Sequence, residues 1–582
     1  MRGLPSVATL LVLGAASAWS LLFAWLAIVR HLAGGSHAED LGFTDQVIWN
    51  FLRGQWFRMS VYQGATWNTE IDVAHVARPD SLLAFHVEPM LLGFVPLYAL
   101  GAGPVVLLAV QALAVGLGAI PAYRLGQHYG RSQWAGVSVA LAYLLSPLGQ
   151  WAVLSDFHTS TFAAPLLLLA AERALVAARS GQGMLAAALA LTAREDVGPA
   201  VALLGISLML LGVPRRVGVR IALMGLLWTI AAAAVLIAYS GGVSPFGMRY
   251  AASIGHGILR PEALGALVTT LLSGAWLGLL SPAALLPAVP ALSSNALSGS
   301  PWMAAGKAHY SGLILPFVIL GAAAGFRPLR QHARAVAVAL LVTSCVAYLA
   351  EGAGPLAANY APATITAHAR LAQDVAARLP SRTAVSASST LAPHLSHRPR
   401  LYLFPAVLDA EYIFVDLRAT STPTSPGDVF LRIRDRLAGG GWEVEAAVDG
   451  LLLLHRDDAA PALSSDDLPV DWLLAPSDLR PAVDQFQLLR SELLPAPDGA
   501  IDVDGPRAIL RTTWRTNAPL PPGTRLEFVI DLQGERIRVW DVAPLWWYPP
   551  ERWQPGQVVT VDISDVPARR FLSWSKTLVS TR

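Results

Sequence analysis

The sequence predicts an α-helical polytopic membrane bundle of about eleven spans, followed by a small α/β domain and a C-terminal β-sandwich-like domain. Hydrophobic residues make up 54% of the 582 residues and charged residues only 14%, which is more apolar than soluble proteins are. Apolar windows of about 20 residues, the length that crosses a bilayer, recur before residue 350. Beyond that point charges are evenly spread and short alternating strands appear.

These patterns divide the chain into three expected domains. The first is a transmembrane domain over residues 1–350 with a long outer loop at 31–101, and the other two are an α/β domain at 351–460 and a β-rich domain at 470–582. The first apolar run continues through Val29, which is too long for a cleaved signal peptide and predicts an uncleaved anchor. The expected spans are 8–30, 102–123, 133–149, 159–178, 183–193, 197–213, 219–240, 264–280, 283–297, 309–326 and 334–350.

The short loops predict the orientation. Arginines concentrate in four of them, and short loops rich in Lys and Arg stay on the cytoplasmic side. The sequence therefore predicts a multi-pass protein of the inner (plasma) membrane, with a cytoplasmic N-terminus and extracytoplasmic C-terminal domains. The arginines concerned are Arg124 and Arg131, Arg173 and Arg179, Arg215, Arg216 and Arg220, and Arg327, Arg330 and Arg334.

Composition and motifs exclude several classes of function. The net charge is +2, and no dense basic patch with interleaved aromatics exists, so nucleic acid is not an expected partner. The one cysteine, Cys345, excludes an intramolecular disulfide and a paired-cysteine metal site. No phosphate-binding glycine loop is present, so nucleotide-driven transport has no support.

The long outer loop contains a stretch with helical periodicity. Between Phe43 and Phe57, apolar residues recur at helical spacing beside Asp45 and Asn50. This pattern predicts an amphipathic helix lying on the membrane surface.

Three polar clusters occur where the topology predicts the outer face: Glu39-Asp40, His86-Val-Glu88 and Asp156-Phe-His158. Carboxylates and imidazoles are costly near lipid, so clusters of them indicate a functional site. We expect the three clusters to converge on one outward-facing cavity. The alternative is that each cluster only caps a helix or lies in a solvated loop.

Two further polar groups have open interpretations. Arg194-Glu195-Asp196 either contributes to the site or neutralises its own charges. Lys307, followed by His309 and Tyr310, either binds a lipid phosphate or anchors the chain at the interface.

The sequence predicts no cofactor with certainty. Asp72 and His75, together with His86 and Glu88, offer ligands that suit a divalent cation. Their spacing matches no established metal motif, so no metal residue is assigned and a divalent cation stays an open alternative.

Several of these residues belong to a longer part of the chain, residues 35 to about 460, that resembles a known family. The run from Asp40 to Asn50, DLGFTDQVIWN, with the polar residues of the later segments, resembles a prokaryotic family of polytopic membrane proteins known as domain of unknown function 2079. That family looks related to the C-type glycosyltransferases, which move a sugar from a polyprenyl-phosphate carrier to an acceptor on the outer face of the membrane. The later segments are His86-Val-Glu-Pro89, Asp156-Phe-His158, Glu195-Asp196, His309-Tyr310, Leu395-Ser-His397-Arg-Pro399 and Tyr412-Ile-Phe-Val-Asp416.

The resemblance implies an enzyme that uses a polyprenyl-phosphate-linked sugar among membrane lipids. Asp40, or Glu39 in its place, would be the catalytic base. Val87 and Glu88 depart from the related His-Pro-Pro-Leu stretch, which leaves the role of His86 open. The rival function is a transporter or lipid-handling protein without chemistry. The expected substrate-binding residues are Asp45, His86, Glu88, Asp156, His158, Arg194, Lys307, His309 and Tyr310.

Overall fold

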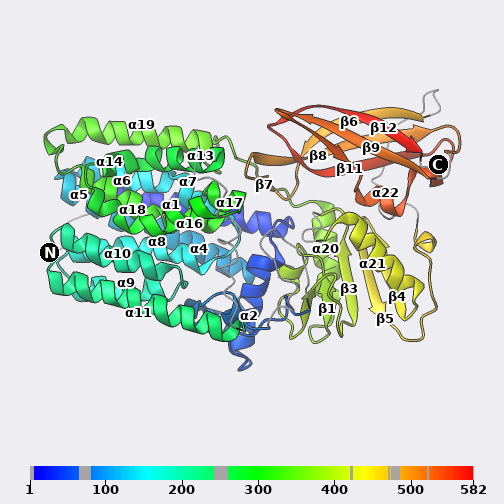
Figure 1. Cartoon of the computed structure of the whole chain (residues 1–582), viewed down its shortest axis with the longest axis horizontal. Coiled ribbons are helices and arrows are strands. Elements are labelled where there is room, and N and C mark those ends of the chain that lie inside the picture. Colours follow the sequence, from blue (N-terminus) through cyan, green and yellow to red (C-terminus); the bar gives the residue numbers. More distant parts are fainter. Residues whose placement is uncertain are drawn as a thin grey trace.

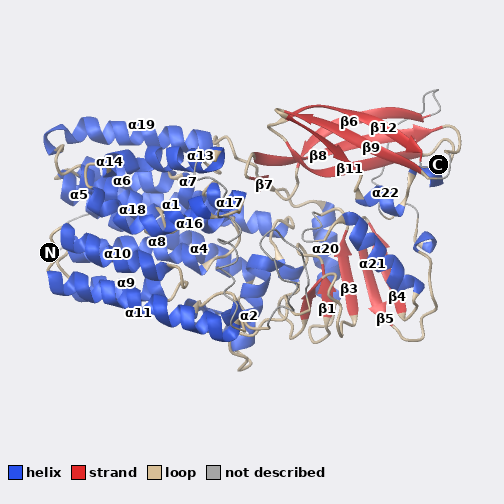
Figure 2. Ribbon diagram, viewed as in Figure 1, coloured by secondary structure: helices blue, strands red, loops and turns tan. Residues whose placement is uncertain are grey.

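The computed structural model describes residues 6–64, 80–241, 260–419, 424–469, 472, 486–520 and 523–580. A helical bundle occupies one end of the molecule, and two units that contain β-sheets occupy the other (Figure 1). The N-terminus lies at the end of the bundle away from the sheets. Helices fill the N-terminal part and nearly all strands lie in the C-terminal part (Figure 2).

The described part of the N-terminal region consists of helices joined by short turns. Its α-helices are α1 (Val7–Leu32), α2 (Phe43–Phe51), α3 (Val95–Ala99), α4 (Pro104–Leu117), α5 (Ala119–Gly130), α6 (Gln133–Leu145), α7 (Pro147–Leu154), α8 (Ala163–Leu175), α9 (Ser180–Leu191), α10 (Val197–Leu210), α11 (Arg215–Tyr239), α13 (Pro261–Thr270), α14 (Trp276–Gly278), α15 (Pro282–Leu285), α16 (Val289–Leu297), α17 (Pro301–Ala304), α18 (Leu315–Gly325) and α19 (Ala333–Glu351).

The number of membrane-crossing helices is smaller than the sequence predicted. Within the described ranges, 4 helices are long and apolar enough to cross a bilayer, or up to 6 if each of two bent pairs counts as one span. The prediction of about eleven spans is therefore wrong. The four are 7–32, 104–130, 215–239 and 330–351, and the bent pairs are 133–145 with 147–154 and 301–311 with 315–325.

Helix breaks and short helices explain the difference. Pro147 begins α7 at 41° to α6, and the second pair bends by 75°, as expected where proline removes a backbone donor. The segment after α13 passes through Gly274, whose φ of +126° is not helical. Helices α8, α9 and α10 have 13, 12 and 14 residues, which is too short to span a bilayer of about 30 Å at 1.5 Å per residue.

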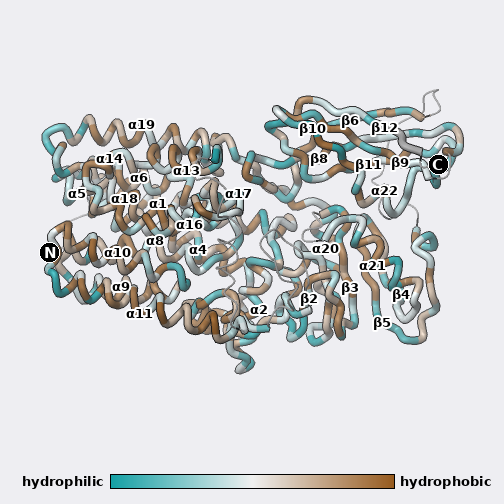
Figure 3. The backbone as a smooth tube through the Cα atoms, in the orientation of Figure 1, coloured by the Kyte–Doolittle hydropathy of each residue, from teal (hydrophilic) through white to brown (hydrophobic). Residues whose placement is uncertain are grey.

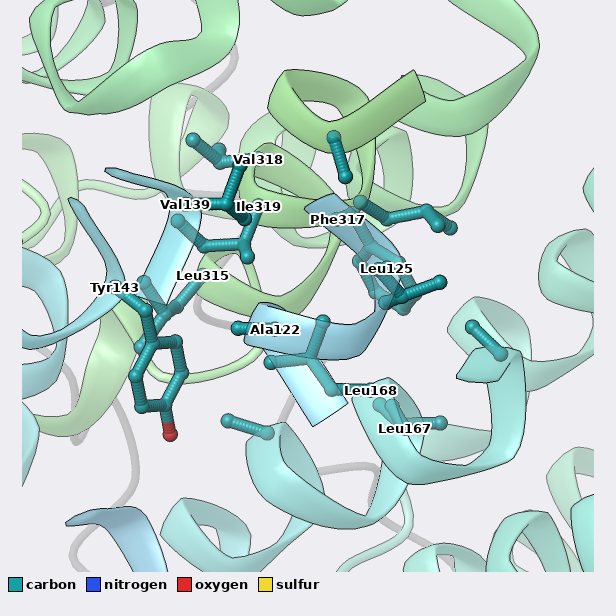
Figure 4. Packing of buried hydrophobic residues seen from close by; sticks show 14 of the residues in the cluster. Ala122, Leu125, Val139, Tyr143, Leu167, Leu168, Leu315, Phe317, Val318 and Ile319 are labelled. Carbon is teal, nitrogen blue, oxygen red and sulfur yellow. The ribbon is translucent and has the colours of Figure 1, made fainter. Parts of the chain in front are cut away.

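The bundle has an apolar core and an apolar exterior. Its core packs side chains from α5, α6, α8 and α18, including Leu125, Val139, Leu168 and Phe317 (Figure 4). Hydrophobic stretches, coloured brown, recur along the bundle helices in Figure 3, and many large hydrophobic side chains of these helices are exposed. Helix α11, for example, exposes a row of leucine and isoleucine side chains. An exterior of this kind suits contact with lipid.

Glycines allow α10 and α11 to pack closely. A Cβ added at Gly205 would lie 2.4 Å from the backbone of Ala222, and one at Gly225 would lie 2.3 Å from the backbone of Ala202. Small residues at such crossings are typical of helix pairs in membranes, where close backbone contact replaces the hydrophobic driving force.

Substitution at this crossing tests the packing. We expect Gly205→Val to lower the free energy of unfolding by about 1–3 kcal/mol, because the two helices must separate to fit the side chain. Gly14→Val in α1 is the control, because a Cβ there has no atom within 4 Å. Thermal unfolding in detergent measures both, and equal midpoints for the two variants would contradict the predicted packing.

A five-stranded sheet follows the bundle, in the order β2-β1-β3-β5-β4. Strands β2, β1 and β3 are parallel, whereas β5 is antiparallel to β3 and β4. The elements are α20 (Ala367–Arg378), β1 (Val385–Ala387), β2 (Leu401–Leu403), β3 (Tyr412–Asp416), α21 (Pro426–Ala438), β4 (Trp442–Val448) and β5 (Leu451–Arg456).

The last described part of the chain is β-rich, as predicted. One sheet has the order β10-β9-β12 and the other β11-β8-β6, with β7 paired to β8. Trp514, Phe528 and Trp553 are buried in the core of this region. The elements are β6 (Phe486–Pro495), β7 (Ile501–Asp502), β8 (Gly505–Thr516), β9 (Thr524–Leu532), β10 (Glu535–Val539), α22 (Ala543–Trp547), β11 (Val558–Pro567) and β12 (Phe571–Ser580).

The predicted surface helix is a buried connection instead. Both the apolar and the polar face of α2 are buried, including Gln46 and Asn50. The Gln46 side chain donates to Ser60 Oγ at 2.9 Å and to the Arg398 carbonyl at 3.0 Å. The polar face of α2 therefore binds residues 58–60 and the loop before β2 rather than water.

An ion-paired histidine joins α20 to the sheet. His368 Nε2 lies 3.0 Å from Asp416 and its Nδ1 lies 3.1 Å from Asp449. Burial alone would lower the pKa of His368, but the two carboxylates outweigh it and raise the pKa from 6.5 to about 10. A raised pKa means that the protonated form stabilises the fold.

This histidine predicts a pH dependence of stability. Its contribution is complete below the unfolded-state pKa of about 6.5 and is lost as the pH rises through about 10. We expect His368→Gln to lower the free energy of unfolding by about 1–3 kcal/mol at pH 6 and to have little effect above pH 10. Thermal unfolding of both proteins from pH 6 to 10.5 measures this, and a constant difference across the range would disprove it.

Candidate functional site

The acidic pair predicted from the sequence lies on a short π-helical turn, η1 (Ala38–Gly42), directly after α1. Asp40 is 38% exposed, and one of its oxygens lies 3.1 Å from His158 Nε2. In the described part of the chain no other side chain binds the Asp40 carboxylate. Asp40 is therefore a carboxylate with a positioned histidine beside it and one oxygen open to solvent.

His158 is held in place by α4. The side-chain oxygen of Gln111 accepts from the His158 backbone N–H at 2.8 Å, and the Gln111 amide donates to the Asp156 carbonyl at 2.8 Å. On its other side the His158 ring stacks on the His309 ring, with centroids 3.7 Å apart. The His309 ring in turn lies 4.2 Å from that of Tyr310. Asp40, His158, His309 and Tyr310 thus form one continuous group.

Glu39 faces the α/β sheet. Its carboxylate accepts a hydrogen bond from Ser389 Oγ, and the Tyr62 hydroxyl donates to its backbone carbonyl at 3.2 Å. The Ser389 carbonyl accepts from the Ala38 N–H at 2.9 Å. Burial raises the pKa of Glu39, and the charge of Asp40 adds to that shift.

Asp156 is fully engaged with the end of the first helix. Arg30 Nη1 lies 2.9 Å from one carboxylate oxygen, and the His37 N–H donates to the other at 2.9 Å. Burial alone would raise the pKa of Asp156, but the charges of Arg30 and His37 outweigh it and hold this pKa well below its usual range. These contacts fix the turn that carries His158, two residues later.

A second polar group lies next to the first. His86 Nδ1 is 2.9 Å from Glu195, whose other oxygen accepts from the Val87 N–H at 2.9 Å. Glu88 is buried, its pKa is raised by that burial, and the Thr159 hydroxyl is a hydrogen-bond partner. Because Thr159 follows His158 directly, the two groups share one turn of chain.

Arg194 takes part in a local ion pair. Its guanidinium forms two hydrogen bonds with Asp196, at 3.0 Å for the Nε contact. Its backbone carbonyl accepts from the Trp228 indole at 3.3 Å. The charge of Arg194 is thus balanced by its own neighbour, as one of the two sequence interpretations proposed.

Asp45 is buried and has three partners. Its oxygens accept from Tyr98 and from Ser396, and His397 Nε2 lies 3.0 Å away. Burial alone would lower the pKa of His397, but the hydrogen bond with Asp45 raises it. These contacts join α2 and α3 to the loop before β2, so the Asp45 carboxylate serves an interface between the bundle and the sheet.

Lys307 lies beside an apolar cavity. Its Nζ donates to the Val503 carbonyl at 2.7 Å and lies 3.7 Å from Glu351 and 5.0 Å from the centre of the Trp151 ring. The cavity has a volume of about 290 Å³ and is lined by α7, α13, α16, α17 and the start of the second bent pair. Lys307 and Glu351 are the charged residues in its lining.

The structure contains no group of three or more metal-ligating side chains in the ranges it describes. Asp72 and His75, two of the possible ligands, lie outside those ranges. The described ligands, His86 and Glu88, have partners in Glu195 and Thr159.

The structure also adds residues that the sequence did not single out: Arg30, His37, Gln111 and Ser389. Arg30 could have been identified from the sequence, because a charged residue near the end of an apolar helix needs a partner. Ser389 could not have been identified from the sequence, because a serine after a short strand is common.

The contacts of Asp45 predict a stability effect that Asp40 does not share. We expect Asp45→Ala to lower the free energy of unfolding by about 3 kcal/mol, because it leaves Tyr98, Ser396 and His397 without their acceptor. Asp40→Asn is the control and should keep the wild-type unfolding midpoint. Thermal unfolding in detergent, together with proteolysis of the 396–398 loop, measures both, and a stable, protease-resistant Asp45→Ala protein would refute this interpretation.

Comparison with known proteins gives a family and no activity. The family described as a predicted membrane protein, DUF2079, matches residues 36–453, which include the acidic turn, the bundle and the five-stranded sheet. No curated protein matches the chain.

Proposed function

This chain belongs to the DUF2079 family of predicted membrane proteins, and we propose that it transfers a sugar from a polyprenyl-phosphate carrier to an acceptor hydroxyl at the outer face of the membrane. Asp40 is the base in this proposal. We also retain the division into a membrane domain at 1–350 and extracytoplasmic domains at 351–460 and 470–582.

The proposal depends mainly on the exposed Asp40 carboxylate beside His158. Asp45 and Asp156 have their carboxylate oxygens bound by other side chains or backbone groups. Asp40 has one contact, with His158 at 3.1 Å, and is 38% exposed. A general base must reach the proton that it removes, and an open oxygen meets that condition.

The proposed step balances as a group transfer. The acceptor oxygen forms a bond to the anomeric carbon while the bond from that carbon to the phosphate oxygen breaks. The Asp40 carboxylate takes the acceptor hydroxyl proton, and the bonding electron pair leaves with the lipid phosphate. His158 holds the carboxylate in place through its hydrogen bond.

The apolar cavity supports a lipid as the donor. It lies where both bent helix pairs break, and most of its lining is hydrocarbon. Lys307 at its edge offers a cation for a phosphate, once displaced from Val503 and Glu351. Arg194 and His309 stay secondary candidates for phosphate binding.

Contacts among the arginine-bearing loops support the proposed orientation. Arg330 Nε donates to the Tyr129 carbonyl at 2.8 Å, and Arg124 lies 3.7 Å from Glu172. The loops after α5 and α18 therefore meet, and α5 lies at the N-terminal end of the bundle (Figure 1). Under the positive-inside rule this end is cytoplasmic and the sheets are extracytoplasmic.

A transporter is the second candidate, and one observation favours it. Discontinuous helices are typical of secondary transporters, and the described part of the chain has two bent pairs and the break at Gly274. In that case the polar group would bind a substrate without reaction.

Replacement of the base tests the proposal. We expect Asp40→Asn to reduce transfer at least 100-fold, because a general base contributes about 10²–10⁴-fold. The measurement is mass spectrometry of surface glycans in a deletion strain that expresses each variant. Asp80→Asn is the matched control, since Asp80 is an exposed carboxylate of the same loop.

Two outcomes would reject the transferase. Wild-type glycans in the Asp40→Asn strain would remove Asp40 from catalysis. Unchanged glycans in the deletion strain, with altered uptake of a labelled solute, would favour the transporter.

A further inference from the structure

The turn η1, which carries Glu39 and Asp40, lies at the carboxyl ends of the parallel strands, where α/β sheets bind ligands. Strands β1 and β3 are parallel neighbours, and β2 lies on the other side of β1. The chain order therefore reverses between β1 and β3, and ligands of α/β sheets bind outside the carboxyl ends of the strands at such a reversal. The residues directly after β1 are Ser388 and Ser389, and η1 packs against this segment.

Ser389 lies between the sheet, which binds its neighbour Ser388, and the turn η1, which binds Ser389 itself. The Ser388 N–H donates to the Phe414 carbonyl of β3 at 3.1 Å, and Ser388 Oγ accepts from the Asp416 N–H at 3.0 Å. The Ser389 carbonyl binds the Ala38 N–H at 2.9 Å, and Ser389 Oγ also lies 3.2 Å from that N–H. Ser389 therefore lies in the turn directly after β1, next to a residue that is bonded to β3, and such support from a rigid element places functional groups with accuracy.

The two adjacent carboxylates have different surroundings. Glu39 binds Ser389 and is covered by the sheet, whereas Asp40 binds His158 and stays partly exposed. A negative charge nearby disfavours ionisation of a second carboxylate, and unequal environments assign two carboxylates different roles. Burial and the charge of Asp40 both favour the protonated form of Glu39.

We propose that Ser389 is a positioning residue for Glu39: its hydroxyl, fixed by the β1–β3 edge, holds the Glu39 carboxyl against the sheet and leaves Asp40 as the base. This inference rests on the proposed transfer reaction. It makes the soluble α/β unit one wall of the site, and it separates the roles of the two acids that the sequence left interchangeable.

A chemical probe tests the positioning without an activity assay. Dicyclohexylcarbodiimide labels protonated carboxyls in apolar surroundings, and peptide mass spectrometry measures the Glu39 adduct against pH in membranes that contain the full-length protein. Since the Ser389 hydroxyl favours the ionised form, we expect Ser389→Ala to move the pH midpoint of labelling upward by about 1 unit. Ser389→Thr keeps the hydroxyl and should restore the wild-type midpoint.

Ser386 provides the matched control. It is a buried serine of β1 whose hydroxyl has no hydrogen-bond partner in the described part of the chain. Ser386→Ala should leave both the labelling midpoint and the surface glycans unchanged. We expect Ser389→Ala to reduce the glycan product at least 10-fold, with recovery in Ser389→Thr.

The two readouts separate this inference from the proposed function. If glycans depend on Asp40 but neither the midpoint nor the product responds to Ser389→Ala, the positioning role is overturned while the transferase stands. If glycans do not depend on the protein at all, the transferase fails, and an upward shift that Thr reverses still supports the contact of Ser389 with Glu39. A midpoint that also moves in Ser386→Ala would overturn the inference, because the effect would then be general to β1.

Discussion

The cost of burying carboxylates at the edge of an apolar bundle governs the arrangement of this protein. A buried ion must be paired or neutralised, since its desolvation costs several kcal/mol. Asp156 meets this demand through Arg30 and the His37 N–H, and Asp45 through Tyr98, Ser396 and His397. The Asp156 contacts join the end of α1 to the turn before η4 (Thr159–Phe162). The geometry of Asp40 and His158 depends on that junction.

The sequence predicted which regions are helical and which are β-rich, but it did not predict how many helices are long enough to cross the membrane. Hydropathy identifies where apolar residues occur and predicted the helical N-terminal region, whereas the alternation of apolar and polar residues predicted the β-rich C-terminal region. It cannot separate a spanning helix from a short one packed within the bundle, because α9, α10 and a true span have similar composition. The bend at Pro147 and the break at Gly274 interrupt two of the predicted spans, 133–149 and 264–280, and hydropathy alone did not reveal either interruption.

The candidate site was predictable in part. Polarity near lipid pointed to Glu39, Asp40 and His158, and the structure brings these residues together. The role of each carboxylate was not predictable, because the partners come from distant elements. Tyr98, Ser396 and Ser389 are ordinary residues in the sequence and become informative only through contacts in three dimensions.

The contact of Glu39 with Ser389 joins residues 350 positions apart. A ribosome adds about 5–20 residues per second, so on the order of 20 to 70 seconds separate the synthesis of the two groups. During that interval the first helices are already in the bilayer while the acidic turn lacks its sheet. The contact between Glu39 and Ser389 consequently cannot form until the five-stranded sheet has been synthesised and folded, which ties maturation of the protein to the last third of its translation.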